Sequence, residues 1–123
     1  MQLETLDHVA LVVSDVGRSV AWYRDVLGLT RAHEEDWGDF PAVLQAGGSG
    51  VALFPSDESI EPSTFDSLPH VGFRTSRVGW EMAKAELRDR GIAFRESDHG
   101  VSWSIYLLDP DRHQIEITTY QPA

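Results

Sequence analysis

Three residues that are far apart in the chain have the right types to bind one divalent metal ion. His8 lies in LDHVALVV, His70 in LPHVGFRT and Glu116 in HQIEITTY. Two imidazoles and one carboxylate suit ions such as Fe(II), Mn(II), Ni(II) and Zn(II), and three ligands on one side of an octahedral ion leave positions for substrate or water. The pattern predicts a metal centre with open coordination positions, if the fold brings the three side chains together.

The two histidines occupy matching places in two similar halves of the chain. Each is followed by an apolar run and then by a segment with apolar residues at helical spacing, SDVGRSVAWYRDVLG and SRVGWEMAKAELRDRG. Gly28 and Gly91 close these segments and suit the C-terminal end of a helix. The apolar stripe expected on the second helix consists of Val78, Met82, Ala85 and Leu87.

Each half then offers three strand candidates. They cover about residues 29–37, 40–47 and 50–55 in the first half and 92–97, 102–109 and 112–119 in the second. The sequence therefore predicts an α+β fold in which a βαβββ module occurs twice within a single domain, at about 1–55 and 69–123. Residues 56–68, SDESIEPSTFDSL, are polar and contain Pro62, so we expect them to be the linker.

Strand alternation puts the candidate ligands on one face of the predicted sheets. In the strand that begins at His8, Val9 and Leu11 share one face, and His8 and Ala10 share the other. Arg74 falls on the same face as His70. It can meet an anionic substrate there or pair with an acidic side chain, and we favour pairing.

The composition disfavours several classes of partner. Twenty acidic and ten basic side chains give a formal net charge of −10, which argues against nucleic acid or an anionic membrane surface as partners. The chain has no cysteine, so disulfides and thiolate chemistry are excluded. No segment approaches the roughly 20 apolar residues of a membrane span, and MQLETLD lacks the features of a secretion signal. We therefore expect a cytoplasmic protein.

Three segments make the chain resemble the vicinal oxygen chelate superfamily, which includes glyoxalases, bleomycin-resistance proteins, fosfomycin-modifying enzymes and extradiol dioxygenases. They are DHVALVVSDVGRSVAWYRDVLGL, PHVGF and SIYLLDPDRHQIEI, and the resemblance covers nearly the whole chain. It implies two βαβββ modules whose sheets form a U-shaped cup around a metal ion, with His8, His70 and Glu116 as ligands. Arg112 departs from the glycine that is common at its place in the family.

Differences from individual family members narrow the expected chemistry. Glyoxalase-type sites add a glutamate on the last strand of module one, and alignment of GVALFPS with QIEITTY puts Ala52 there instead. Ala10 stands where fosfomycin-type enzymes usually have a hydroxyl residue, and the sequence ends without their basic tail. The extradiol dioxygenase branch is then the most similar. It implies Fe(II) or Mn(II) as the metal, with Zn(II), Ni(II) or Co(II) as alternatives.

The resemblance to extradiol dioxygenases also implies two catalytic residues. His99, in DHGVS, would move protons, and Tyr106 would hydrogen-bond a substrate oxygen. We therefore expect a metal-dependent enzyme that acts on a small substrate chelated through vicinal oxygens. Two alternatives remain open: a non-catalytic protein that binds an antibiotic or aromatic small molecule, and a glyoxalase-like lyase or isomerase.

Assembly is a further implication of the resemblance. Two modules leave sheet edges that a second copy can pair, and relatives commonly pair modules between chains, so we expect a homodimer. Whether His8 and His70 come from one chain or from two stays open in the sequence.

Overall fold

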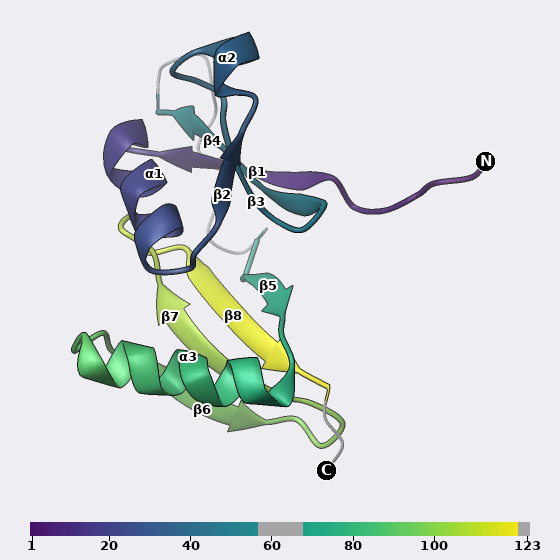
Figure 1. The fold of residues 1–123 in the computed structure, drawn as a ribbon, viewed down its shortest axis with the longest axis vertical. Helices are drawn as coiled ribbons and strands as arrows, with labels where there is room; N and C mark the ends of the chain where they lie inside the picture. The colour runs from purple at the N-terminus through teal and green to yellow at the C-terminus, as the bar shows by residue number, and fades with distance from the viewer. Residues whose placement is uncertain (57–67, 121–123) are drawn as a thin grey trace. The chain divides into compact units, whose positions relative to one another are not determined.

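The computed structural model describes residues 1–56 and 68–120 and divides into two compact units, Met1–Ser63 and Thr64–Ala123 (Figure 1). The elements of the first unit are β1 (His8–Val13), α1 (Val16–Asp25), β2 (Thr30–Ala32), α2 (Glu34–Trp37), β3 (Ala42–Ala46) and β4 (Ser49–Pro55). Those of the second are β5 (Val71–Arg74), α3 (Arg77–Asp89), β6 (Arg95–Asp98), β7 (Trp103–Leu108) and β8 (Gln114–Thr119). The α+β class and the repeated βαβββ order are confirmed. Most of the predicted linker lies outside the described residues.

The two sheets have the same strand order. It is β1-β4-β3-β2 in the first unit and β5-β8-β7-β6 in the second. In each sheet the first and last strands of the unit pair in parallel, and the other neighbours are antiparallel. The strand that begins at His8 and the strand that follows His70 therefore each lie beside the last strand of their own unit.

A predicted glycine follows each long helix, directly after the C-cap residue Arg90 of α3 and two residues after the C-cap residue Val26 of α1. Gly28 follows α1 with φ of +69°, and Gly91 follows α3 with φ of +68°. Glycine adopts this left-handed conformation without the steric cost that a Cβ atom brings. At its other end, α3 is capped by Ser76, whose hydroxyl accepts a hydrogen bond from the Gly79 amide at 3.0 Å.

The buried face of α3 differs from the predicted apolar stripe. Three of the four stripe residues are exposed: Val78, Met82 and Ala85. Leu87, the fourth stripe residue, is buried as predicted, and Trp80 and Lys84 are buried with it. The Lys84 ammonium lies 3.9 Å from the centre of the Trp80 ring and 3.0 Å from the Glu96 carboxylate, so its charge is compensated while its stem is buried. A stripe chosen by hydropathy alone misses this arrangement.

Residues 33–37 were predicted to continue a strand, and this was wrong. The strand β2 ends at Ala32, and α2 follows after His33, whose φ is 62°. The first turn of α2 carries Glu34, Glu35 and Asp36. Negative charge at this end of a helix is stabilised by the backbone N–H groups there, which favours a helical turn over an extended segment.

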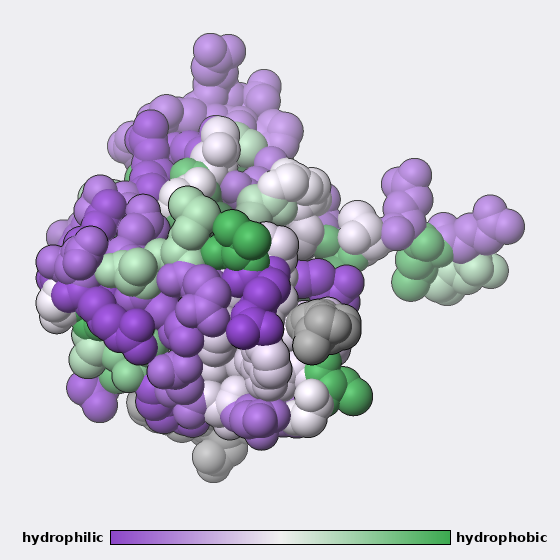
Figure 2. Space-filling view, turned by 60° about the horizontal axis from the view of Figure 1, so that its bottom comes forward, coloured by the Kyte–Doolittle hydropathy of each residue, from purple (hydrophilic) through white to green (hydrophobic). Residues whose placement is uncertain are grey.

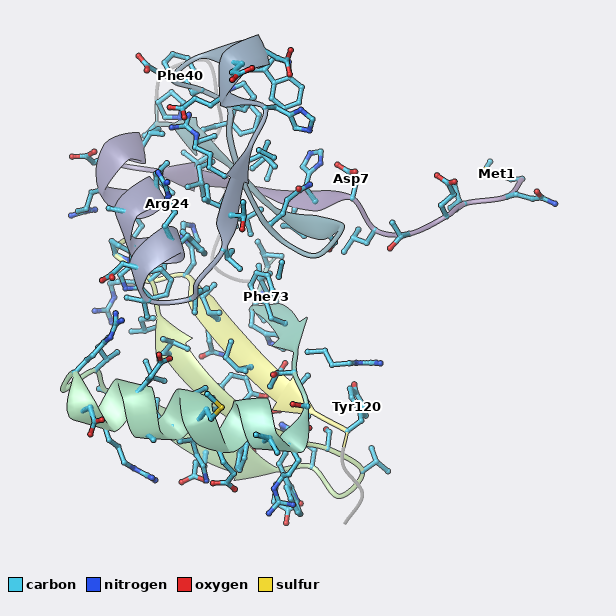
Figure 3. All side chains as sticks on the ribbon, viewed as in Figure 1. Met1, Asp7, Arg24, Phe40, Phe73 and Tyr120 are labelled. Atoms are coloured by element: carbon cyan, nitrogen blue, oxygen red, sulfur yellow. The ribbon has the colours of Figure 1, made fainter. Side chains whose placement is uncertain are left out.

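The predicted alternation in β1 is confirmed by burial. Leu11 and Val13 are 2% and 1% exposed, whereas His8 and Ala10 are exposed. Residues 1–7 before β1 have exposed side chains and run as an extended segment between the labelled Met1 and Asp7 (Figure 3).

Hydrophilic side chains cover most of the face shown in Figure 2, in agreement with the excess of acidic residues. In the described parts of the chain, no helix has the length and apolar character needed to cross a membrane.

Candidate metal centre

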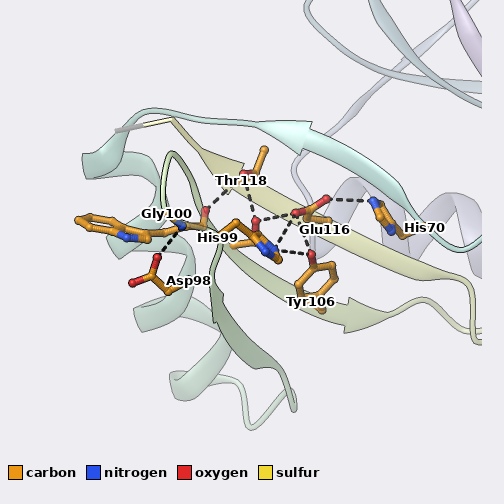
Figure 4. Close-up of polar contacts among 9 residues, drawn as sticks. His70, Asp98, His99, Gly100, Tyr106, Glu116 and Thr118 are labelled. Atoms are coloured by element: carbon orange, nitrogen blue, oxygen red, sulfur yellow. Dashed lines mark hydrogen bonds and ion pairs between the residues drawn. The ribbon is translucent and has the colours of Figure 1, made fainter. Parts of the chain in front are cut away.

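The second unit brings two of the predicted ligands together. Glu116 lies in β8 and pairs with Gly72 of β5, two residues after His70. His70 Nε2 is 3.1 Å from Glu116 Oε1 (Figure 4). Two ligand atoms at right angles on one ion, with bonds of about 2.1 Å, lie about 3 Å apart. The nitrogen and the oxygen therefore have a spacing that suits a shared metal ion.

Gly72 leaves the room that the carboxylate needs. A Cβ atom added at this position would lie 3.2 Å from Glu116 Oε1, which is closer than an ordinary van der Waals contact. A larger residue would have to displace the carboxylate oxygen that faces His70. The glycine is therefore part of what positions Glu116.

Two hydroxyl groups hold the other oxygen of Glu116. Ser104 and Tyr106, both in β7, donate hydrogen bonds to Oε2 at 2.5 Å and 3.0 Å. Ser104 is completely buried, and the Glu116 side chain is 13% exposed. Hydrogen bonds of this kind orient the carboxylates that bind metals. They leave Oε1, the oxygen near His70, as the candidate metal ligand of this carboxylate.

His99 extends this network toward solvent. It lies between β6 and β7, its Nε2 is 2.9 Å from the Tyr106 hydroxyl, and its side chain is 44% exposed. Because the single Tyr106 proton is donated to Glu116, the nitrogen of His99 has to be the donor in this contact. Burial and the hydrogen bond to Glu116 raise the pKa of Tyr106 above its ordinary value, so the hydroxyl is protonated at neutral pH.

His8 belongs to the first unit. Its Nδ1 is 2.8 Å from the Asp7 carboxylate, and a carboxylate on one ring nitrogen is a usual partner of a histidine that binds metal through the other. Within the described residues, neither unit by itself contains a group of three side chains that could hold a metal. The structure therefore brings His70 and Glu116 together, and the contribution of His8 stays a prediction.

The strand register agrees with the alignment of Ala52 with Glu116. Ala52 pairs with Ala10, two residues after His8, just as Glu116 pairs with the second residue after His70. In the first unit, a methyl group therefore takes the place of the carboxylate.

Three polar residues near Glu116 were not predicted as site residues. Thr118 Oγ1 lies 3.0 Å from the hydroxyl of Ser104, and the guanidinium carbon of Arg95 lies 4.2 Å from the centre of the Tyr106 ring. Alternation along β7 and β8 could have identified Ser104 and Thr118 once Glu116 was chosen. Arg95 could not be found this way because its place depends on the register between β6 and β7.

Known proteins share both the sequence pattern and the fold. Residues 5–117 match the family model described as the Glyoxalase/Bleomycin resistance protein/Dioxygenase superfamily. The chain belongs to this superfamily. The family expected from the sequence is thereby confirmed.

Members of the superfamily with different names resemble this chain to a similar degree. Glutathione transferase FosA from Serratia marcescens is 28% identical over 116 residues, which are 94% of this chain and 80% of FosA. Catechol-2,3-dioxygenase from Bacillus subtilis is 30% identical over 122 residues, which are 95% of this chain and only 42% of the dioxygenase. The crystal structure of virulence protein STM3117 from Salmonella typhimurium gives a TM-score of 0.73 at 26% identity and covers 98% of this chain and 100% of that chain.

Proposed function

We propose that this protein is a metal-dependent enzyme that acts on a small substrate bound through two vicinal oxygens. The observation that carries the proposal is the His70–Glu116 contact of 3.1 Å, with the second carboxylate oxygen already held by Ser104 and Tyr106. The proposed ligands are His8, His70 and Glu116. Fe(II) or Mn(II) suits this set best, and Zn(II), Ni(II) and Co(II) are alternatives. When bound, such an ion holds two neighbouring substrate oxygens and draws electron density from them.

His99 and Tyr106 are the proposed catalytic residues. Tyr106 lies 3.0 Å from Glu116, so its hydroxyl can also meet a substrate oxygen held beside that carboxylate. His99 contacts Tyr106 and is partly exposed, so it links the hydroxyl with solvent. This arrangement supports a role for the pair in passing protons between a bound substrate and water.

The extradiol dioxygenase type of reaction is our first candidate, because it uses two histidines and one glutamate without a fourth protein ligand. Similarity to a catechol-2,3-dioxygenase supports it, although this chain spans less than half of that protein. A glyoxalase-like isomerisation has weaker support because Ala52 stands where a carboxylate is needed.

Thiol transfer is a second candidate function. It is favoured by the similarity to glutathione transferase FosA, of which this chain covers 80%, about twice the share of the dioxygenase that it covers. Ala10, in place of a hydroxyl residue, counts against a fosfomycin-type substrate. The two candidates share the metal site and differ in the co-substrate, which is O₂ in one and a thiol in the other.

Metal uptake is the first test of the proposal. The protein is purified without chelator, incubated with Mn(II), Fe(II) or Zn(II), desalted and measured by elemental analysis. We expect tight binding of one ion per site and a large loss in His8→Ala and His70→Ala, with His33→Ala as a control for a histidine outside the site. A wild-type chain that retains none of these ions would contradict the proposal.

Turnover separates the candidate functions. The metal-loaded protein is supplied with catechols and O₂, with fosfomycin and glutathione, or with the hemithioacetal of methylglyoxal and glutathione. Oxygen consumption would support the dioxygenase type, and loss of thiol would support transfer. Saturable binding of an aromatic or antibiotic ligand, with turnover in none of the assays, would instead favour the non-catalytic alternative.

We also propose a homodimer in which His8 and His70 come from one chain or from both. In each sheet the strand that bears or follows the histidine is at an edge, so its outer backbone groups have no neighbour in that sheet. Light scattering at micromolar concentration tests this proposal. A mass near the 13.7 kDa of one chain would contradict it.

A further inference from the structure

The sheet of the second unit carries different charges on its two faces. We define the site face as the one that bears Glu116. Among its paired strand residues the charged ones are Arg74, Arg95 and Glu116, whereas the paired residues of the opposite face include the acids Glu96 and Asp98. In a chain with twice as many acidic as basic residues, two arginines beside a single carboxylate make this face locally basic.

Arg95 is the arginine that reaches the site. It pairs with Tyr106, which pairs with Glu116, so the three residues form one row across β6, β7 and β8. The guanidinium carbon lies 4.2 Å from the centre of the Tyr106 ring, and the hydroxyl of that ring donates to Glu116. The ring lies between the cation and the carboxylate, and its π face attracts the guanidinium.

Among the described residues, no acid accepts a hydrogen bond from the N–H donors of Arg95. Its side chain is exposed, and it forms no ion pair with a carboxylate in residues 1–56 or 68–120. Arg88 and Lys84, on the other side of the sheet, both pair with Glu96. Arg74 stacks on Tyr120, with 4.7 Å between the guanidinium carbon and the ring centre, so the expected pairing with an acid is not found among the described residues.

We infer that Arg95 binds a carboxylate group of the substrate. The inference rests on the proposed function: the vicinal oxygens of the substrate occupy the metal at His70 and Glu116, and its carboxylate extends across Tyr106 to the guanidinium. The planar fork of arginine donors matches the two oxygens of a carboxylate. Arg95 is then a specificity residue that selects an anionic vicinal-oxygen compound over a neutral one.

Two probes that differ by one carboxylate test this inference. Catechol and 3,4-dihydroxybenzoate are titrated anaerobically into Mn(II)-loaded protein, and both affinities are measured by calorimetry after the Mn(II) content has been checked. We expect wild type to prefer 3,4-dihydroxybenzoate by about tenfold or more. Arg95→Ala should lose most of this preference by weakening only the carboxylate compound. Arg95→Lys should retain part of it because the charge remains without the fork.

Arg88→Ala is the matched control. Arg88 also stacks on an aromatic ring, that of Phe94 at 5.4 Å, but it lies on α3, outside the site face. The Arg88→Ala variant should prefer 3,4-dihydroxybenzoate over catechol by the same factor as wild type. Equal affinities for the two probes in wild type, or an unchanged ratio in Arg95→Ala, would overturn the inference while leaving the proposed metal site intact. Failure to take up Mn(II) would overturn the proposed function and this inference with it.

Discussion

In each unit, the second residue after the histidine pairs with a residue of the last strand. That last-strand residue is Ala52 in the first unit and the carboxylate Glu116 in the second. Ala52 pairs with Val43 in the first unit, and Glu116 pairs with Tyr106 in the second. Both positions lie in the last strand of a sheet with the same order. The fold therefore supplies this position twice, and the side chains around it differ.

The difference shows what a partly buried carboxylate requires. Glu116 accepts hydrogen bonds from Ser104 and Tyr106, whereas Ala52 has the apolar Val43 opposite it. A carboxylate without partners is costly to bury, so it is useful only together with neighbouring donors. In the second unit the carboxylate and its hydroxyl donors occur together, and in the first unit Ala52 and Val43 take the places of Glu116 and Tyr106.

Removal of the carboxylate should have the largest effect. Glu116→Ala deletes the only anionic side chain of the proposed ligand set, so Mn(II) affinity should fall at least about a hundredfold in calorimetry. Glu96→Ala is the control, since Glu96 lies in the same sheet on the opposite face. Equal affinities for wild type and Glu116→Ala would exclude Glu116 from the site.

A carboxylate placed at the corresponding position of the first unit should destabilise the fold. Ala52 is 2% exposed, so Ala52→Glu should reduce the free energy of unfolding by about 2–3 kcal/mol in urea titrations. Ala21→Glu, at an exposed position of α1, should have little effect. If the first unit lacks only a hydroxyl donor for a carboxylate at position 52, the double variant Ala52→Glu/Val43→Tyr should regain part of the lost free energy of unfolding. A stable Ala52→Glu single variant would show that the position tolerates charge without donors.

Substitution of Ser104 tests the role of the hydroxyl donors without replacing a proposed metal ligand. Ser104→Ala should lower Mn(II) affinity about tenfold because one of the two bonds that orient Glu116 is lost. Ser104→Thr retains a hydroxyl and should recover part of the affinity. Ser102→Ala removes another buried serine hydroxyl and serves as the control. A loss of stability with unchanged affinity would mean that Ser104 serves only the packing.

The turns before the last strands offer a smaller contrast. Gly47 has φ of +64° between β3 and β4, and Arg112 has φ of +71° between β7 and β8. Arg112→Gly should therefore raise the free energy of unfolding by up to about 1 kcal/mol, because the left-handed conformation strains a residue with a Cβ atom. Gly47→Ala should lower it by a similar amount. A lower urea midpoint in Arg112→Gly, or a higher one in Gly47→Ala, would contradict the prediction.

The smallest effect concerns pH and the same turn of the second unit. A hydrogen bond from His113 to the buried Asp109 raises the pKa of His113 above its ordinary value. The folded state then binds this proton more tightly, so the contribution to stability is present below the ordinary histidine pKa and is lost as the pH rises through the raised value. His113→Gln should therefore cost more stability at about pH 5.5 than at about pH 8.5. Equal losses at the two pH values would contradict this sign.

Much of the fold could be predicted because periodicity and glycine carry local information. The repeated module, the end of α3 before Gly91, and the alternation in β1 all follow from sequence patterns. One error, over residues 33–37, arose where local acidic residues favour a helical turn, and the other arose where a partner distant in sequence decided burial. Lys84 is buried because Glu96 and Trp80 receive its charge, and hydropathy assigned that place to aliphatic residues.

The candidate site was predictable to the extent that residue type identifies a ligand. A glutamate between two isoleucines is unusual in a strand, so the sequence indicated Glu116 as a ligand, and the structure brings it to His70. The positions of Ser104 and Arg95 depend on how β6, β7 and β8 align, which is set by the whole sheet. The union of His8 with the other two depends on the arrangement of the units and remains a prediction.

Gly72 has a consequence for how such a protein could evolve. It is not a ligand, yet a single methyl group added there would press on the carboxylate oxygen that faces His70. One substitution here would therefore weaken the proposed metal centre without replacing a ligand, a hydroxyl donor or Arg95. Under the proposed function, Gly72 is therefore a position at which a single substitution separates the capture of a small molecule from its conversion.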